Sequence, residues 1–179
     1  MENPSDRQQV LRLELANRIF FRMYQCANML YKTASRAVEP EGLTAQQWAV
    51  LGALSRPEAQ GGMSIGDLAR YLMVTRQNLS GLISRMERDG HVVSAPDGRD
   101  RRSRLVTMTE AGEDVWRHRV PPRIEAYYEQ ALDGFSVRDM THTLHYLQLL
   151  LENMERVDAV QSGGADPADE EGAEAPGAA

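Results

Sequence analysis

Two short segments rich in β-branched residues, 91–95 and 104–108, directly follow a helical pattern in this chain. Between them lies PDGRDRR at 96–102, which combines turn-forming proline, aspartate and glycine with three arginines. This arrangement predicts a β-hairpin with a charged tip. Most of the remaining patterns are helical, so the chain is expected to be mainly α with one small β element.

The stretch that ends at Gly90 predicts a helix with two unlike faces. Thr75 is its expected N-cap. Apolar residues recur at i, i+3, i+4 and i+7 and mark the buried face: Leu79, Leu82, Ile83 and Met86. The opposite face is polar, small and basic: Gln77, Ser80, Gly81, Ser84, Arg85 and Arg88. An ordinary solvated face carries Glu and Lys instead, so this face is expected to contact a partner.

Two shorter helices are expected upstream of this one. Thr44 with Gln47 forms a capping-box signature before Trp48. Ser64 caps the next helix, whose expected buried residues are Ile65, Leu68, Ala69 and Leu72. Because only a short turn separates this helix from Thr75, the two form a helix-turn-helix, which the hairpin follows as a wing.

Long amphipathic patterns flank this central region. An apolar stripe runs through 8–36: Leu11, Leu15, Ile19, Met23, Ala27, Leu30 and Ala34. Helical patterns resume over 110–157, are interrupted by Pro121 and Pro122, and end in a heptad-like series: Met140, Leu144, Leu147, Leu151 and Met154. Further apolar residues lie off the first stripe, so a second copy of the chain is expected to cover them.

The net charge of −6 is distributed unevenly. Six acidic residues and no basic ones follow position 157, whereas residues 1–157 carry 20 of each sign. Residues 70–104 hold eight arginines and four acids, so the helix-turn-helix region is locally basic. We expect a flexible N-terminus at 1–7, a folded domain at 8–157 and an acidic disordered tail at 158–179.

Several function classes find no support in the sequence. Cys26 is the only cysteine, the N-terminus does not resemble a signal peptide, and no run of 18 apolar residues occurs. The expectation is a cytoplasmic protein without membrane contact, metal or other cofactor. No nucleophile–base–orienter trio indicates an enzyme, and we interpret His118, His142 and His145 as packing or solvated residues rather than ligands.

The helix-turn-helix and wing together predict binding of double-stranded DNA. The second helix of such a motif enters the major groove, where guanidinium and amide groups pair with base edges. Arg99 at the wing tip suits a narrow minor groove. The expected DNA-binding residues are Thr75, Arg76, Gln77, Ser80, Ser84, Arg85, Arg99, Arg101 and Arg102.

Residues 64–112 resemble the core of the MarR family of winged-helix transcription regulators. The most specific element is the wing sequence DGRDRR at 97–102, which the segment TEAG at 109–112 follows. The resemblance implies a homodimer in which the first helix and the last two intertwine. It also implies dimerisation helices at about 8–36 and 110–157, a DNA-binding lobe at about 44–109, and a ligand pocket where helices and lobe meet.

Six residues on the helices expected to line that pocket offer aromatic walls, an amide and a guanidinium: Tyr24, Asn28, Tyr31, Arg36, Trp48 and Trp116. This set suits a small aromatic acid or its CoA thioester. The predicted function is a repressor that occupies a pseudo-palindromic operator and leaves it when the ligand binds.

Other interpretations remain open. Cys26 is either a buried small hydrophobe or a peroxide-sensing thiol, since its surroundings loosely resemble the organic-peroxide branch of the family. A non-DNA helical interaction protein and an enzyme are the more remote alternatives.

Overall fold

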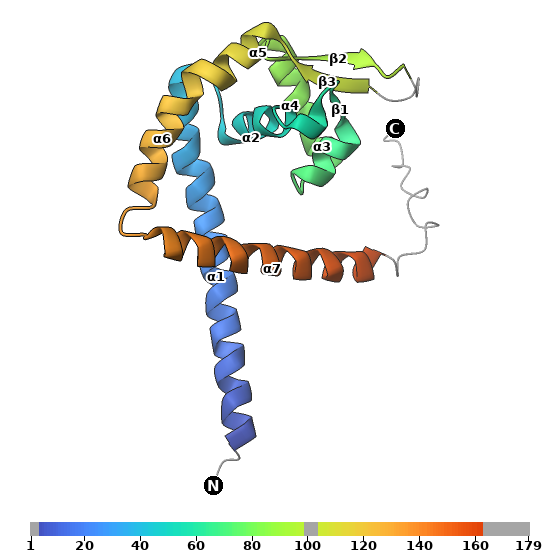
Figure 1. Cartoon of the computed structure of the whole chain (residues 1–179). Helices are drawn as coiled ribbons and strands as arrows, with labels where there is room; N and C mark the ends of the chain where they lie inside the picture. Colours follow the sequence, from blue (N-terminus) through green and yellow to red (C-terminus); the bar gives the residue numbers. More distant parts are fainter. Residues whose placement is uncertain (1–3, 99–103, 163–179) are drawn as a thin grey trace, which may run out of the picture. The chain divides into compact units, whose positions relative to one another are not determined.

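The computed structural model describes residues 4–98 and 104–162, which form two compact units divided between Ala131 and Leu132. The first unit contains α1 (Pro4–Val38), η1 (Glu39–Glu41), α2 (Ala45–Leu54), η2 (Pro57–Ala59), β1 (Met63–Ser64), α3 (Ile65–Tyr71), α4 (Arg76–Arg88), β2 (Val92–Pro96), β3 (Arg104–Met108), α5 (Glu110–Asp114), the π-helical turn η3 (Val115–Arg119) and α6 (Val120–Ala131) (Figure 1). The second unit contains α7 (Val137–Ser162). The predicted fold class, mainly α with a small β wing, is confirmed.

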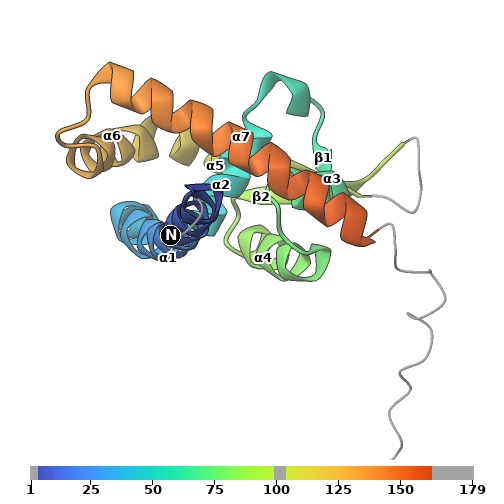
Figure 2. The same cartoon turned by 90° about the horizontal axis from the view of Figure 1, so that it is seen from below.

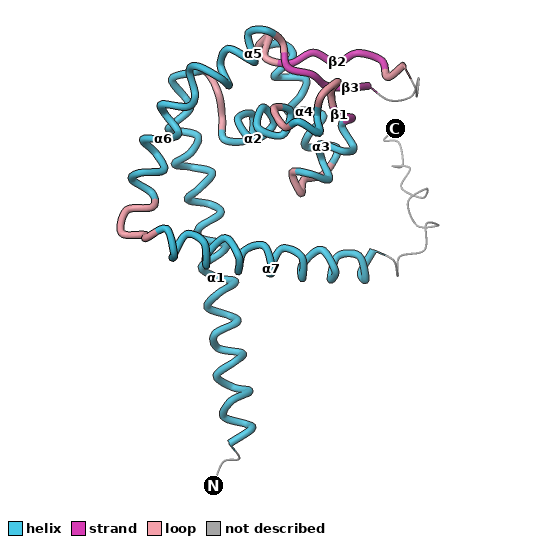
Figure 3. Tube along the Cα trace, viewed as in Figure 1, coloured by secondary structure: helices cyan, strands magenta, loops and turns pink. Residues whose placement is uncertain are grey.

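The hairpin predicted from 91–95 and 104–108 is present as antiparallel β2 and β3, with Val92 opposite Met108 and Ala95 opposite Leu105. A two-residue strand, β1, adds to the other side of β3 through Met63 and Ser64, so the sheet order is β1-β3-β2 (Figure 3). β1 was not predicted from the sequence, because two residues are too few to show a period of two.

Side-chain caps begin several helices, including the three that Thr44, Ser64 and Thr75 were predicted to cap. Thr44, Ser64, Thr75 and Thr109 each accept a hydrogen bond from the backbone N–H three residues on. In the second unit, Ser136 caps α7 in the same way, because its hydroxyl accepts from the Asp139 N–H at 3.2 Å. Each cap satisfies a donor that the first helical turn leaves unpaired, which fixes where the helix starts.

One apolar core holds the first unit together. The predicted inner face of α4 is buried in it, with Leu79, Leu82, Ile83 and Met86 all at most 7% exposed. Leu68 from α3, Leu51 from α2 and Val106 from β3 belong to the same cluster. The helix-turn-helix and the wing therefore share one core, which fixes how α4 is presented.

The helix α1 contacts α6, and Figure 2 shows α1 end on, with α6 on one side and α4 on the other. The hydroxyls of Thr33 and Tyr127 share a hydrogen bond of 3.0 Å across the α1–α6 contact. Just beyond the C-terminus of α1, the half-buried Glu41 carboxylate accepts from Arg123 at 3.2 Å. These contacts hold the C-terminal half of α1 and the following turn η1 against α6.

Three boundaries differ from the sequence expectations. α1 begins at Pro4 rather than at residue 8, since proline is favoured in a first turn that has no partner for its N–H. α7 continues to Ser162, so 158–162 are helical; the remainder of the expected tail lies outside the described residues. Near Pro121 and Pro122, which lack N–H groups, the chain forms the π-helical turn η3 before α6.

Each unit leaves a row of large apolar side chains exposed. On α1 the row includes Leu11, Leu15, Ile19 and Leu30, and on α7 it includes Leu144, Leu147 and Leu151. Isolated soluble domains rarely expose contiguous apolar surface of this extent. No helix in the described ranges combines the length and apolarity needed to cross a bilayer.

Candidate nucleic-acid interface and ligand cavity

The helix α4 presents an exposed polar face. The leucines on its other face are buried in the core and hold the helix in position. Thr75 caps it, accepting from the Asn78 N–H at 3.3 Å. Every α4 side chain predicted to contact DNA is exposed: Arg76, Gln77, Ser80, Ser84 and Arg85. The burial of Leu79 and Ile83 on the opposite side rules out rotation of this face inward.

The two serines lie close along the helix. The Ser80 hydroxyl donates to the Arg76 carbonyl at 2.8 Å, and the Ser84 hydroxyl donates to the Ser80 carbonyl at 3.1 Å. These two serines and Gly81 between them add little bulk to this face of the helix, so the longer side chains of Gln77 and Arg85 project beyond them. Small side chains allow a helix to approach a DNA groove closely, and the long side chains can then reach the base edges.

Arg76 lies against the start of α3. A methyl group at Gly66 would come within 3.3 Å of an Arg76 guanidinium nitrogen, so glycine there leaves room for the arginine. The nearby Asp67 carboxylate accepts from the Ser64 hydroxyl at 2.7 Å and from Arg70 at 2.8 Å. The Ser64 hydrogen bond, then the Arg70 hydrogen bond and the charges of Arg70 and Arg76, lower the pKa of Asp67.

One polar contact ties the wing to α4, and another lies within the wing. The Glu87 carboxylate accepts from the Ser94 N–H at 3.0 Å, and Arg104 donates to the Ser94 carbonyl at 2.6 Å. The first contact fixes β2 relative to α4, and the second joins the two strands of the hairpin. Arg99, Arg101 and Arg102 lie outside the described residues.

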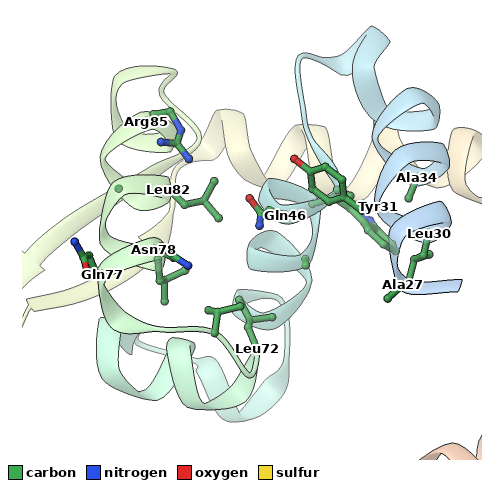
Figure 4. A pocket seen from close by; sticks show the side chains of 16 residues that line it. Ala27, Leu30, Tyr31, Ala34, Gln46, Leu72, Gln77, Asn78, Leu82 and Arg85 are labelled. Atoms are coloured by element: carbon green, nitrogen blue, oxygen red, sulfur yellow. The ribbon is translucent and has the colours of Figure 1, made fainter. Parts of the chain in front are cut away.

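A cavity of about 630 Å³ lies between α1, α2, the turn before α4, and α4 itself (Figure 4). Ala27, Leu30 and Tyr31 form its α1 wall, and Trp48 belongs to its α2 wall. This volume lies within the range of small-molecule sites in proteins. The two aromatic residues give the cavity the flat apolar surfaces that an aromatic ring would contact.

Figure 4 shows the polar groups of the cavity on both walls. Gln46 and Asn78 point into the space from α2 and α4, and the Tyr31 hydroxyl faces it from α1. Gln46, Asn78 and Leu72 line the cavity but were not predicted as ligand contacts. Nothing in their local spacing signals a cavity, because it forms only when α4 packs opposite α1.

Of the six residues predicted to bind a ligand, Tyr31 and Trp48 line this cavity and the other four do not. Tyr24, Asn28 and Arg36 are exposed on α1. Trp116 instead packs on the lobe core, where its ring would lie 3.2 Å from a methyl group at Gly52. A glycine opposite the indole explains this position, since any larger residue would displace the ring.

The remaining candidates are separate from the cavity. In the single chain Cys26 is exposed, which corrects its interpretation as a buried small hydrophobe. His118 lies 3.0 Å from the Asp114 carboxylate, and His142 and His145 are exposed on α7. Within the described ranges, no three His, Cys, Asp or Glu side chains gather as metal ligands would.

Comparison with known proteins adds to this geometry. Residues 41–103 match the model of the MarR family. The transcriptional activatory protein BadR of Rhodopseudomonas palustris is 67% identical over 152 residues, which cover 85% of this chain and 87% of BadR. The chain belongs to the MarR family of transcriptional regulators. The homoprotocatechuate degradative operon repressor of Escherichia coli is 31% identical over 62% of this chain and 72% of its own length.

Solved structures of the MarR family have the same fold. AbsC from Streptomyces coelicolor aligns with a TM-score of 0.66 and 24% identity, over 87% of this chain and 97% of AbsC. MepR from S. aureus, solved in complex with DNA, aligns with a TM-score of 0.65 and 20% identity over 76% of this chain and 96% of MepR. The winged helix-turn-helix architecture predicted from the sequence is thus confirmed.

Proposed function

We propose that this MarR-family regulator binds double-stranded DNA with α4 in the major groove and the wing beside it. The observation that carries the proposal is the exposed row of Gln77, Gly81 and Arg85 on a helix whose other face is fully buried. The α4 residues predicted from sequence serve as its DNA contacts, together with the wing arginines Arg99, Arg101 and Arg102. Base edges in the major groove supply the matching donors and acceptors.

The α4 residues divide into two roles in this proposal. Gln77 is exposed, and in Figure 4 its side chain points away from the centre of the cavity that it helps to line. Its amide suits the edge of an adenine. Arg76, which lies against the start of α3, contacts the phosphate backbone, as do Thr75, Ser80 and Ser84. Phosphate contacts set the register of the helix and Gln77 reads sequence.

A homodimer is the proposed binding unit. The exposed apolar rows on α1 and α7 provide the surface that a second copy would cover. A two-fold axis presents two copies of α4, so the operator is a pseudo-palindrome with half-sites about one helical turn, roughly 10 base pairs, apart or a multiple of it.

The proposed effector is a small aromatic acid or its CoA thioester. The cavity supports this with the Tyr31 and Trp48 rings and with amides from Gln46 and Asn78. The name of the E. coli relative refers to homoprotocatechuate, which is an aromatic carboxylate. Such a ligand would bind beside the DNA-reading helix, where its presence can change DNA affinity.

Two directions of regulation are proposed. Repression with release by the ligand follows from a dimer that covers the operator, and the E. coli relative is named a repressor. Activation is favoured by the name of the 67% identical relative, a transcriptional activatory protein. The position of the operator relative to the promoter determines whether a bound dimer represses or activates transcription.

The test of DNA binding is selection of bound duplexes from a random pool, followed by titration of the selected duplex at several salt concentrations. We expect a pseudo-palindromic sequence and an affinity that falls steeply with salt. Failure to enrich any sequence would contradict the proposal. In vitro transcription from a promoter carrying the selected site then decides between repression and activation.

A further inference from the structure

Two connections join the DNA-binding lobe to the helices α1 and α6. The turn η1 and Gly42 lead from α1 to α2, and η3 leads from α5 to α6. Figure 1 shows α6 starting beside the C-terminal end of α1, so the two connections lie close together. Because the lobe has one core, a change of angle at these connections moves α4 together with the rest of the lobe.

Charged side chains link the two connections. The Glu41 carboxylate in η1 accepts from the Arg123 Nε at 3.2 Å and lies 3.9 Å from a terminal nitrogen of Arg119 in η3. The Arg119 Nε in turn lies 3.4 Å from the Asp114 carboxylate at the end of α5. We call these four residues the charged cluster, and they join η1 to α5, η3 and α6.

Glu41 is the least exposed member of the charged cluster. Its side chain is 12% exposed, whereas those of Asp114, Arg119 and Arg123 are 56%, 49% and 51% exposed. An ion pair at an exposed surface contributes little, because water and salt screen it. A largely buried carboxylate depends on its partners, so Glu41 holds Arg119 and Arg123 in one arrangement.

The apolar contacts of the same region fix the angle less strictly. Val115 and Val120, at the two ends of the second connection, are buried in the lobe core, and so is Val38 at the end of α1. Apolar burial is non-directional, so these contacts tolerate small rotations of one helix against another. Hydrogen bonds between charged groups add geometric specificity, so the charged cluster selects one orientation.

We propose that Glu41 is a positioning residue that fixes the orientation of the lobe on α1 and α6, and thereby the half-site spacing that the dimer accepts. The inference rests on the proposed function, in which two copies of α4 bind one operator. The helix α1 carries an exposed apolar row of the proposed dimer interface. A rotation of the lobe on α1 therefore moves one copy of α4 relative to the other.

The test compares duplexes that differ only in half-site spacing. The selected duplex is the reference, and two further duplexes have one base pair inserted or removed between the half-sites. Each base pair turns one half-site by about 35° and shifts it by about 3.4 Å relative to the other. Affinities are measured by fluorescence anisotropy, and the readout is their ratio between duplexes. Loss of folded protein lowers all three affinities alike and leaves this ratio unchanged.

We expect the wild type to bind the altered duplexes roughly tenfold more weakly than the selected one, because the two copies of α4 no longer fit both half-sites. Glu41→Gln removes the buried charge at nearly constant volume and should reduce this difference to a few-fold. Arg123→Gln removes its hydrogen-bond partner and should act in the same direction. If Glu41→Gln does not fold, Arg123→Gln decides the test.

Glu39→Gln is the matched control. Glu39 belongs to the same turn η1 but is exposed, and within the described ranges it forms no ion pair. Its substitution removes the same charge and should keep the wild-type ratio.

A wild-type ratio in both Glu41→Gln and Arg123→Gln would overturn the inference, as would an equal change of the ratio in Glu39→Gln. A wild type that binds all three duplexes equally would also overturn it, since no spacing preference would then exist. Failure of the proposed function is a different result, in which the wild type binds no duplex at all.

Discussion

Gly112 is the residue at which the described structure leaves least room for a side chain. A methyl group there would lie 2.0 Å from the backbone oxygen of His91, between the end of α4 and the start of the wing. That oxygen also accepts from the Thr109 N–H at 3.1 Å, so it has little freedom to move.

We therefore expect Gly112→Ala to lower the free energy of unfolding by about 1–3 kcal/mol, as overpacking of a tight core does. Urea denaturation followed by circular dichroism measures this. Gly98→Ala is the control, because nothing lies within 4 Å of a methyl group there, and it should change stability by less than about 0.5 kcal/mol. Equal effects of the two substitutions would contradict the packing described at Gly112.

Trp116 and Tyr31 show how far the sequence predicts whether a single residue lines a pocket. Both are aromatic residues on expected helices, and the sequence offers the same reason to place each in a pocket. Their difference depends on the opposite residue: Gly52 accommodates the Trp116 ring against the lobe core, whereas Tyr31 faces the cavity across from α4. Contacts between distant segments decide such cases, and local patterns do not contain them.

The starts of helices were the most predictable feature of the elements, because a cap depends only on one side chain and the backbone N–H three residues on. Thr44, Ser64 and Thr75 all cap where expected. The strand β1 and the π-helical turn η3 were not foreseen, because each is defined by hydrogen bonds that a residue spacing does not reveal. The cavity depends on how α1, α2 and α4 pack together, and local residue patterns do not predict that packing.

The cap of α3 gives a pH prediction at the scale of an element. The Ser64 hydrogen bond, reinforced by Arg70, lowers the pKa of Asp67 below its usual value of 3.8. A carboxyl with a lowered folded-state pKa adds stability above its unfolded-state pKa, and that contribution is lost as the pH falls through the folded-state value. Asp67→Asn removes the titrating group.

We expect the wild type to lose more stability than Asp67→Asn between about pH 6 and pH 3, so the difference between them shrinks with acidification. Melting temperatures at several pH values measure this. Asp133→Asn, in the turn after α6, is the control and should follow the wild type. A difference between wild type and Asp67→Asn that stays constant over this range would contradict the assigned role of Asp67.

At the scale of the whole molecule, the proposed homodimer follows from the apolar rows on α1 and α7. Light scattering at micromolar concentration should give about twice the chain mass of 20.0 kDa. Leu147 is half-exposed within the α7 row, and a charge there would be costly to bury. Leu147→Glu should therefore shift the mass toward the monomer, whereas Gln148→Glu on the neighbouring exposed position should not. A monomeric wild type would contradict both the dimer and the symmetry of the operator.

The central claim is that α4 reads base edges, and Gln77→Ala tests it most directly. Affinities of the wild type and the variant are measured by fluorescence anisotropy on the selected duplex and on a random duplex at one salt concentration. We predict a loss of about 1–3 kcal/mol on the selected duplex, a clearly smaller loss on random DNA, and relaxed preference at one base position in each half-site. Equal losses on both duplexes would show that this helix does not read sequence and would contradict the account.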